Sequence, residues 1–258
     1  MYTTCQITNL DSSAVLDLVT DNRYILTGIT GLHAPAGLLT QNPAAGGIDG
    51  SVISGTRRDT RNLVFTIRII NDVEAARLNL YNIFPTGQKI RFSYKLPSTP
   101  ALSIDGYVET AEVTPFTQTE TITVSVICPD PYFRDATART ISITGAGSGT
   151  IDNSKGLDTG IICTIKAQGG AVTNPSITTP AGTTTLNITI ASGKTLIISS
   201  DPGAKYVSYD GSRCLPFTGL PIWPTIKARQ VNGVSLSADS GAPYMRTQIA
   251  FRGKYLGA

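Results

Sequence analysis

The segment Leu63–Tyr94 constrains the fold of this chain most, because its hydrophobic period changes twice. Along Leu63–Ile70 apolar side chains recur at every second residue, which is the period of a strand. Between residues 72 and 84 the apolar positions follow the spacing of a helix that packs one face against a sheet. Alternation returns at Ile90–Tyr94. The segment therefore predicts a strand, a short helix at about 72–84, a turn and a second strand.

Both ends of the predicted helix carry sequence signals. Asn71 and Glu74 have the spacing of a capping box, so we expect their side chains to cap the first turn. Phe84 precedes Pro85, and a residue before proline is disfavoured in the helical region, so the helix should end there. Pro85 and Gly87 suit the second and fourth positions of a type I turn. The rest of the sequence contains no comparable helix signal.

The composition narrows the class of protein. The chain has 258 residues, enough for two domains, and only 15% of them are charged, with a formal net charge of +3. So small a charge does not indicate a nucleic-acid or membrane-surface binder. No run approaches the ~18 apolar residues that span a membrane, and residues 1–10 lack the features of a secretory signal. The four cysteines show no paired spacing, so we expect no disulfide framework and synthesis in a reducing compartment.

We expect two β domains, at residues 1–137 and 138–258. In the first, the glycine- and proline-rich Gly31–Gly50 is expected to be a long irregular connection. In the second, Thr-rich strands separated by turns are typical of a β-sandwich, and Thr144–Thr150 is predicted as a loop. The further strands predicted in the first domain are Cys5–Thr8, Val15–Val19, Tyr24–Thr30, Ser51–Thr56, Gly106–Val113 and Ile122–Cys128. Those predicted in the second are Thr140–Ile143, Gly160–Lys166, Ser176–Thr179, Thr183–Ile190, Thr195–Ser199, Tyr206–Tyr209, Thr225–Val231 and Thr247–Tyr255.

Motifs for catalysis or cofactor binding are weak. His33, the single histidine, has no nucleophile motif near it. Gly145–Gly149 does not have the spacing of a dinucleotide-binding loop, and Gly193–Thr195 lacks the first glycine of a P-loop. Several carboxylates could pair as in a glycosidase, but solvated strand faces explain them better: Asp49, Asp59, Glu109, Glu112 and Glu120. We therefore expect no enzyme activity, no catalytic residues, no metal and no cofactor.

Two groups of residues remain as candidate sites. Arg57, Arg58 and Arg61 concentrate positive charge around one turn, which is either a solvated turn or part of an inter-subunit interface or channel lining. Aromatic residues gather in the second half and could stack on sugars, although most such residues belong to a core or its rim. The residues of this possible carbohydrate platform are Tyr206, Tyr209 and Trp223.

The order of these signals resembles the distal tail (Dit) protein family of long-tailed bacteriophages. The resemblance is strongest up to Phe133 and rests on the strand–helix–turn unit and the Cys128–Phe133 motif, Cys-Pro-Asp-Pro-Tyr-Phe. Further matching positions are Gly55, Arg57, Glu74, Arg77, Leu80, Tyr81, the Ile104–Glu109 segment, Trp223 and the closing Arg252–Gly257 segment.

The resemblance implies a mainly β fold, with an N-terminal β-sandwich or split-barrel-like ring domain that carries one α-helix and a galectin-like C-terminal β-sandwich. It implies a structural virion protein, made in the bacterial cytoplasm, whose copies form a six-fold ring. That ring would join the tail tube and tape-measure proteins to the tail-associated or tip protein, with receptor-binding protein as a further partner. DNA would pass through its channel only in transit, and no membrane would be involved.

Two other functions are open at this stage. A lectin-like, receptor-binding tail protein that uses Tyr206, Tyr209 and Trp223 would bind cell-wall carbohydrate, and a glycan array would detect it. A cell-wall hydrolase would need a metal cluster or a nucleophile with its base, and the sequence offers neither.

Overall fold

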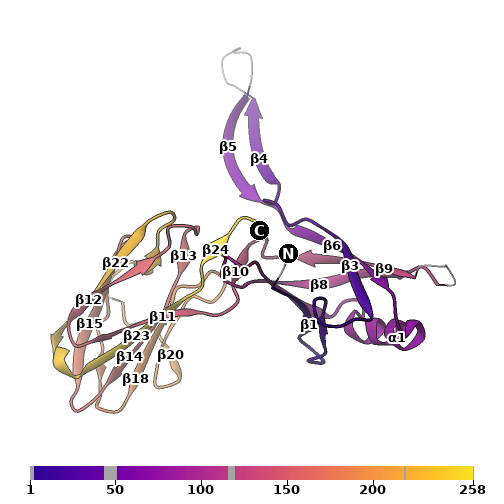
Figure 1. Ribbon diagram of the computed structural model, residues 1–258. Coiled ribbons are helices and arrows are strands. Elements are labelled where there is room, and N and C mark those ends of the chain that lie inside the picture. Colours follow the sequence, from indigo (N-terminus) through magenta and orange to yellow (C-terminus); the bar gives the residue numbers. More distant parts are fainter. Residues whose placement is uncertain (1–2, 44–50, 116–119, 218, 258) are drawn as a thin grey trace. The chain divides into compact units, whose positions relative to one another are not determined.

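The computed structural model describes residues 3–43, 51–115, 120–217 and 219–257. The chain divides into two compact units (Figure 1). Unit 1 comprises residues 1–136 together with 256–258, and unit 2 comprises residues 137–255. Both units are built mainly from strands, as the sequence predicts. Among the residues described, no helix is long and apolar enough to cross a membrane.

Unit 1 is an antiparallel sheet with one helix. Its strand order is β2-β1-β7-β8-β9-β6-β3, and β10 pairs with β8. The elements are β1 (Thr4–Asn9), β2 (Val15–Asp17), β3 (Tyr24–Thr30), β6 (Arg61–Ile69), α1 (Val73–Ile83), β7 (Lys89–Lys95), β8 (Leu102–Val113), β9 (Thr121–Cys128) and β10 (Phe133–Asp135). The strand–helix–strand prediction at residues 63–94 is thus confirmed by β6, α1 and β7.

The alternating pattern of these strands directs one set of side chains into a common core. Aromatic rings run through it from β6 to β10, with centroid separations of 5.0 Å for Phe65–Phe92, 5.5 Å for Phe92–Tyr94 and 5.6 Å for Tyr94–Phe133. Helix α1 closes part of this core with its buried face, Ala76, Leu80 and Ile83. Such aromatic pairs contribute about 0.5–1.5 kcal/mol each beyond their buried area.

The details at the helix ends differ from the expectation. The Asn71–Glu74 capping box does not form, because the helix begins at Val73, one residue later than that box requires, and Asn71 Nδ2 donates to the Asn22 carbonyl at 2.7 Å. Asp72 is the N-cap instead, with φ 48° and no side-chain cap bond. The turn after the helix lies one residue later than expected: Gln88 N–H donates to the Pro85 carbonyl at 3.2 Å, so Gly87 occupies the third turn position with φ +83°. A positive φ at that position is what a type II turn requires.

The prediction of an irregular connection at Gly31–Gly50 is wrong over much of that range. Strand β4 (Gly37–Pro43) pairs with β5 (Ser51–Arg58) to form a sheet of two strands separate from the main sheet of unit 1. Figure 1 shows this hairpin extending away from that sheet. The sequence did not reveal β4 because neither face of the hairpin is buried, so no alternation of apolar and polar residues is required.

Unit 2 is a sandwich of two antiparallel sheets around one core. The first sheet has the order β11-β23-β14-β18-β19-β20, and the second has the order β12-β22-β15-β16, with β17 on β15. Buried side chains of both sheets form a single apolar cluster. The elements are β11 (Arg139–Thr144), β12 (Gly147–Asp152), β13 (Thr159–Gly160), β14 (Ile162–Ala167), β15 (Val172–Thr179), β16 (Gly182–Thr185), β17 (Thr189–Ile190), β18 (Thr195–Ser199), β19 (Tyr206–Tyr209), β20 (Ser212–Cys214), β21 (Thr225–Ile226), β22 (Val231–Ser240), the 3-10 turn η1 (Ala242–Tyr244), β23 (Met245–Phe251) and β24 (Lys254–Tyr255).

Four expectations for unit 2 are corrected. The strand predicted at Thr183–Ile190 is divided into β16 and β17, and the one predicted at Thr247–Tyr255 is divided into β23 and β24. The predicted loop Thr144–Thr150 is a tight turn followed at once by β12, which pairs along its length with β22. The strand predicted at Thr225–Val231 is interrupted, because Arg229 has φ 58° in a turn between β21 and β22. A positive φ is uncommon for a residue with a side chain and breaks a strand.

Candidate functional site

The β4–β5 hairpin is the most unusual surface of unit 1. Its strands pair from Gly37 opposite Arg58 to Pro43 opposite Ser51, with a bulge after Thr40. Leu39, Val52 and Ile53 are each more than half exposed, at 52%, 59% and 53%. Large apolar side chains on an exposed ribbon indicate a surface that another element covers in the assembled protein.

Apolar side chains occur on both faces of the hairpin. Leu38 and Leu39 are consecutive residues of β4, and Val52 and Ile53 are consecutive residues of β5. Because successive side chains of a strand point to opposite faces, each face receives apolar groups from both strands. An isolated two-stranded hairpin is at best marginally stable in water. Contact with a second surface would therefore both bury these groups and stabilise the hairpin.

The base of the hairpin carries the first two of the predicted arginines. Arg57 and Arg58 are exposed, and Arg58 Nη1 lies 3.5 Å from the Pro35 carbonyl. The Asp59 N–H donates to the Ala36 carbonyl at 3.2 Å, which closes the base. Neither arginine forms an ion pair with a carboxylate in the described part of the chain. Both cations thus remain available to an interface.

Arg61 behaves differently from these two. It is 3% exposed, and its guanidinium donates to four backbone carbonyls, those of Gly31, His33, Pro131 and Leu256. The distances are 2.7 Å from Nε to the Pro131 oxygen and 2.6 Å from Nη1 to the His33 oxygen. Burial lowers the pKa of this guanidinium. As a channel or surface residue Arg61 does not fit, because its charged group lies inside unit 1.

The role of Arg61 follows from what it joins. Gly31 and His33 lie on the segment that leads into β4, Pro131 belongs to the Cys128–Phe133 motif, and Leu256 belongs to the last residues of the chain. The guanidinium also lies over the Phe133 ring, 4.8 Å from its centroid. One buried side chain therefore fixes the root of the hairpin to the core.

The aromatic residues of the predicted carbohydrate platform are separated. The Tyr206 ring is covered by Arg213, whose guanidinium carbon is 4.7 Å from the ring centroid. Tyr209 lies on the opposite face of β19, packs against the core cluster, and accepts a hydrogen bond from Ala191 N–H at 3.3 Å. Tyr206 and Tyr209 therefore do not share one stacking surface.

Trp223 has its own neighbours. Its ring contacts Phe217 edge-on at 5.4 Å, and Lys205 Nζ lies 6.0 Å from its centroid. The indole is half-buried against the core of unit 2. Its contacts are those of a residue at the rim of the sandwich.

The remaining titratable groups do not converge on a reaction site. Within the described ranges, no cluster of three or more His, Cys, Asp and Glu side chains is placed to hold a metal. Of the carboxylates considered for a glycosidase pair, Glu120 forms an ion pair with Arg77 of α1 at 3.1 Å, and Glu109 accepts a hydrogen bond from Ser125 at 2.8 Å. Asp49 lies outside the described residues. Glu120 and Glu109 thus connect elements of the fold.

The cysteines are free thiols. Burial raises the pKa of Cys5 to about 11 and of Cys128 and Cys163 to about 12. The pKa of Cys214, which is partly exposed, is also raised. Thiols held in the protonated form are poor nucleophiles.

Comparison with known proteins identifies the fold. No protein-family model and no curated protein matches the sequence. Among solved structures, the Dit (gp 19.1) protein of phage SPP1 is similar, with a TM-score of 0.69 and 17% sequence identity over 98% of this chain and 99% of that one. Its structure is described as a paradigm of the hub adsorption apparatus in phages that infect Gram-positive bacteria. The resemblance found in the sequence is thus confirmed at the level of the fold.

Proposed function

We propose that this chain, which has the fold of a phage Dit protein along nearly its whole length, is a structural component of the tail of a long-tailed bacteriophage or prophage. The fold match supports this role because it covers both units rather than one common domain. The protein would reside in the virion, at the distal end of the tail.

The proposed mechanism is self-association of unit 1 into a six-fold ring. The β4–β5 hairpin is the observation that carries it, because its two apolar faces need a covering surface that the described part of unit 1 does not provide. A second copy of the chain is the partner that every copy is certain to meet. When the hairpin of one copy binds a different surface of the next copy, the contact is head-to-tail. Repeated head-to-tail contacts close into a ring when the rotation between neighbouring copies permits closure.

The ring would act as an adaptor with a central channel. We propose that one side contacts the tail tube and tape-measure proteins and the other contacts the tail-associated or tip protein, while DNA passes through only in transit. Arg57 and Arg58 lie at the base of the hairpin, where they would face either the neighbouring copy or the channel. Their lack of an ion pair among the described residues supports such a role.

Charged substitutions in the hairpin test this proposal. Val52→Lys with Ile53→Lys places two cations on the faces to be buried, which removes the apolar gain and adds a desolvation cost. We expect the wild-type chain to sediment as a ring and the double variant as a monomer, at equal concentration in analytical ultracentrifugation.

Val231→Lys is the matched control, because Val231 is 61% exposed against 59% for Val52 and lies on a strand of unit 2. This variant should assemble as the wild type does. Rings that persist in the hairpin variant would exclude the hairpin as the contact between copies.

A further inference from the structure

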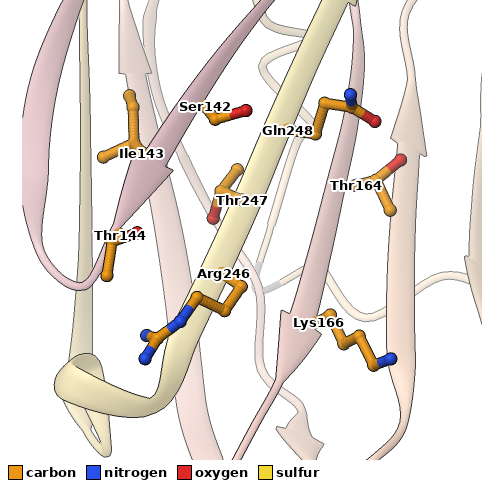
Figure 2. Close-up of a pocket in the computed structure, with 8 residues that line it drawn as sticks. All are labelled: Ser142, Ile143, Thr144, Thr164, Lys166, Arg246, Thr247 and Gln248. Carbon is orange, nitrogen blue, oxygen red and sulfur yellow. The ribbon is translucent and has the colours of Figure 1, made fainter.

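The open face of the first sheet of unit 2 contains a shallow recess of about 320 Å³. It spans β11, β23 and β14, which are neighbours in the sheet (Figure 2). The buried residues Ile143 and Thr247 contribute to its lining. The other lining residues are six with polar side chains: Ser142, Thr144, Thr164, Lys166, Arg246 and Gln248. Three of these lie in one row across the strands, because Gln248 is opposite both Ser142 and Thr164.

Two cations lie on neighbouring strands at one end of the recess. Lys166 of β14 is directly opposite Arg246 of β23, and like charges at opposite positions of neighbouring strands destabilise a sheet. Neither forms an ion pair with a carboxylate that the structure describes. Arg246 Nη1 donates to the carbonyls of Pro243 and Met245 at 2.9 and 3.0 Å. Figure 2 shows the two charged ends directed apart, and the hydrogen bonds to these two carbonyls orient that of Arg246.

The hydroxyl and amide groups of the recess also lack partners. The side chains of Ser142, Thr144, Thr164 and Gln248 make no hydrogen bond to any described residue. The open face of the second sheet provides a comparison inside the same unit. There some of the hydroxyl groups pair across strands, with 2.6 Å between Ser176 and Ser237 and 2.9 Å between Thr178 and Thr183. The recess is therefore a polar surface whose donors and acceptors are left for another molecule.

We propose that this recess binds a phosphate-bearing sugar or polyol. Lys166 and Arg246 would hold the phosphate, which relieves their repulsion, and the hydroxyl and amide groups would bind the hydroxyl groups of the ligand. The volume is at the lower end of the range for small-molecule sites.

An acidic protein segment fits this recess less well. A peptide usually adds to a sheet through the free backbone groups of an edge strand. Here β23 lies between β11 and β14, and β14 lies between β23 and β18, so the backbone of both strands is already paired. The side chains that line the recess are polar, apart from Ile143 of the core, and offer no apolar pocket for a peptide side chain. The recess must therefore recognise its ligand through polar side chains alone. A phosphorylated polyol suits such a surface because it carries a negative charge and several hydroxyl groups.

Ligand-observed NMR with the full-length chain tests the proposal. The probes are glycerol phosphate, glycerol, inorganic phosphate and a glutamate oligomer. We expect glycerol phosphate to bind more tightly than either inorganic phosphate or glycerol, because only it engages both the cations and the hydroxyl groups. Equal binding of inorganic phosphate would overturn the polyol assignment. Binding of the glutamate oligomer without glycerol phosphate would overturn the ligand class, and no binding of any probe would overturn the site.

Two single variants identify the residues. Lys166→Gln and Arg246→Gln should each weaken glycerol phosphate binding by about tenfold, the loss of one charge-assisted contact. Lys155→Gln, an exposed lysine in the loop after β12, should leave binding unchanged. The melting temperature separates this role from a structural one, because removal of one of two repelling cations should keep or raise it. Unchanged binding in both variants, or a lowered melting temperature with the loss of binding, would contradict the assignment.

Discussion

At the scale of single residues, Arg61 is held by backbone carbonyls rather than by a carboxylate. Its planar guanidinium presents donors in several directions, which suits four acceptors from three distant segments. The sequence placed Arg61 with Arg57 and Arg58 because the three are neighbours in a basic stretch. In the structure Arg61 is buried, whereas Arg57 and Arg58 are exposed. No local pattern in the sequence indicates this difference in burial.

Replacement of Arg61 should destabilise unit 1. Arg61→Ala leaves four carbonyls without a donor in a buried setting, at an expected cost of about 3 kcal/mol or more in the free energy of unfolding. Arg61→Lys keeps the charge but gathers its donors at one point, so it should recover only part of that loss. Urea unfolding followed by far-UV circular dichroism measures both. A lysine variant as stable as wild type would show that charge alone, and not the fork geometry, is required.

The thiol of Cys163 predicts a dependence of stability on pH. Its pKa is about 12 in the folded chain, against about 8.5 for an unfolded cysteine. Above pH 8.5 the unfolded state therefore loses this proton while the folded state keeps it, so the folded state is progressively disfavoured as the pH rises. By pH 10 this thiol lowers the free energy of unfolding by about 2 kcal/mol.

Cys163→Val removes the titrating group at similar volume and should reduce that loss. Trp223 is the single tryptophan and lies in unit 2, so its fluorescence reports the unfolding of the same unit. Cys214→Val should change the pH dependence less, since Cys214 is partly exposed. Equal slopes for wild type and Cys163→Val between pH 8.5 and pH 10 would contradict the account of this thiol.

At the scale of elements, α1 offers a test with an internal control. Leu80 is fully buried against the sheet, whereas Leu78, two residues earlier on the same helix, is 56% exposed. Leu80→Ala should cost about 3 kcal/mol of stability through lost burial and the cavity it leaves. Leu78→Ala should change stability by no more than about 0.5 kcal/mol. Thermal unfolding measures the difference, and equal effects would show that the helix does not dock through this face.

The elements that the sequence predicted are those with one buried face. From Leu63 to Ile69 in β6 and from Ile90 to Tyr94 in β7 every second residue is apolar and buried, and α1 has a single apolar stripe, so their periods are visible. Strand β22 was missed because Asn232 occupies one of its inward positions, beside the glycine at 233. The buried Asn232 side chain accepts from Lys227 N–H at 2.8 Å and donates to the Lys227 and Gln230 carbonyls, both at 3.1 Å. A polar residue whose side chain forms hydrogen bonds with the preceding turn interrupts the apolar pattern of the sequence without interrupting the strand.

At the scale of the whole molecule, the sequence predicted two β units but not the surface on which the proposed assembly depends. The β4–β5 hairpin carries exposed apolar groups on both faces, and the copy that we propose to cover it lies outside the single chain. The sequence of β4 therefore resembles a loop when the chain is considered alone, whereas β5 was predicted as a strand at Ser51–Thr56. The sequence did not predict the recess of unit 2 either, because its residues come from strands β11, β14 and β23 and meet only through sheet pairing.

Imaging of the purified protein by negative-stain electron microscopy tests the central proposal most directly. The account predicts closed rings with an open centre for the wild-type chain, and single particles for the Val52→Lys, Ile53→Lys variant. A wild-type chain that stays monomeric at every concentration, and also with the tail-tip partner added, would contradict it.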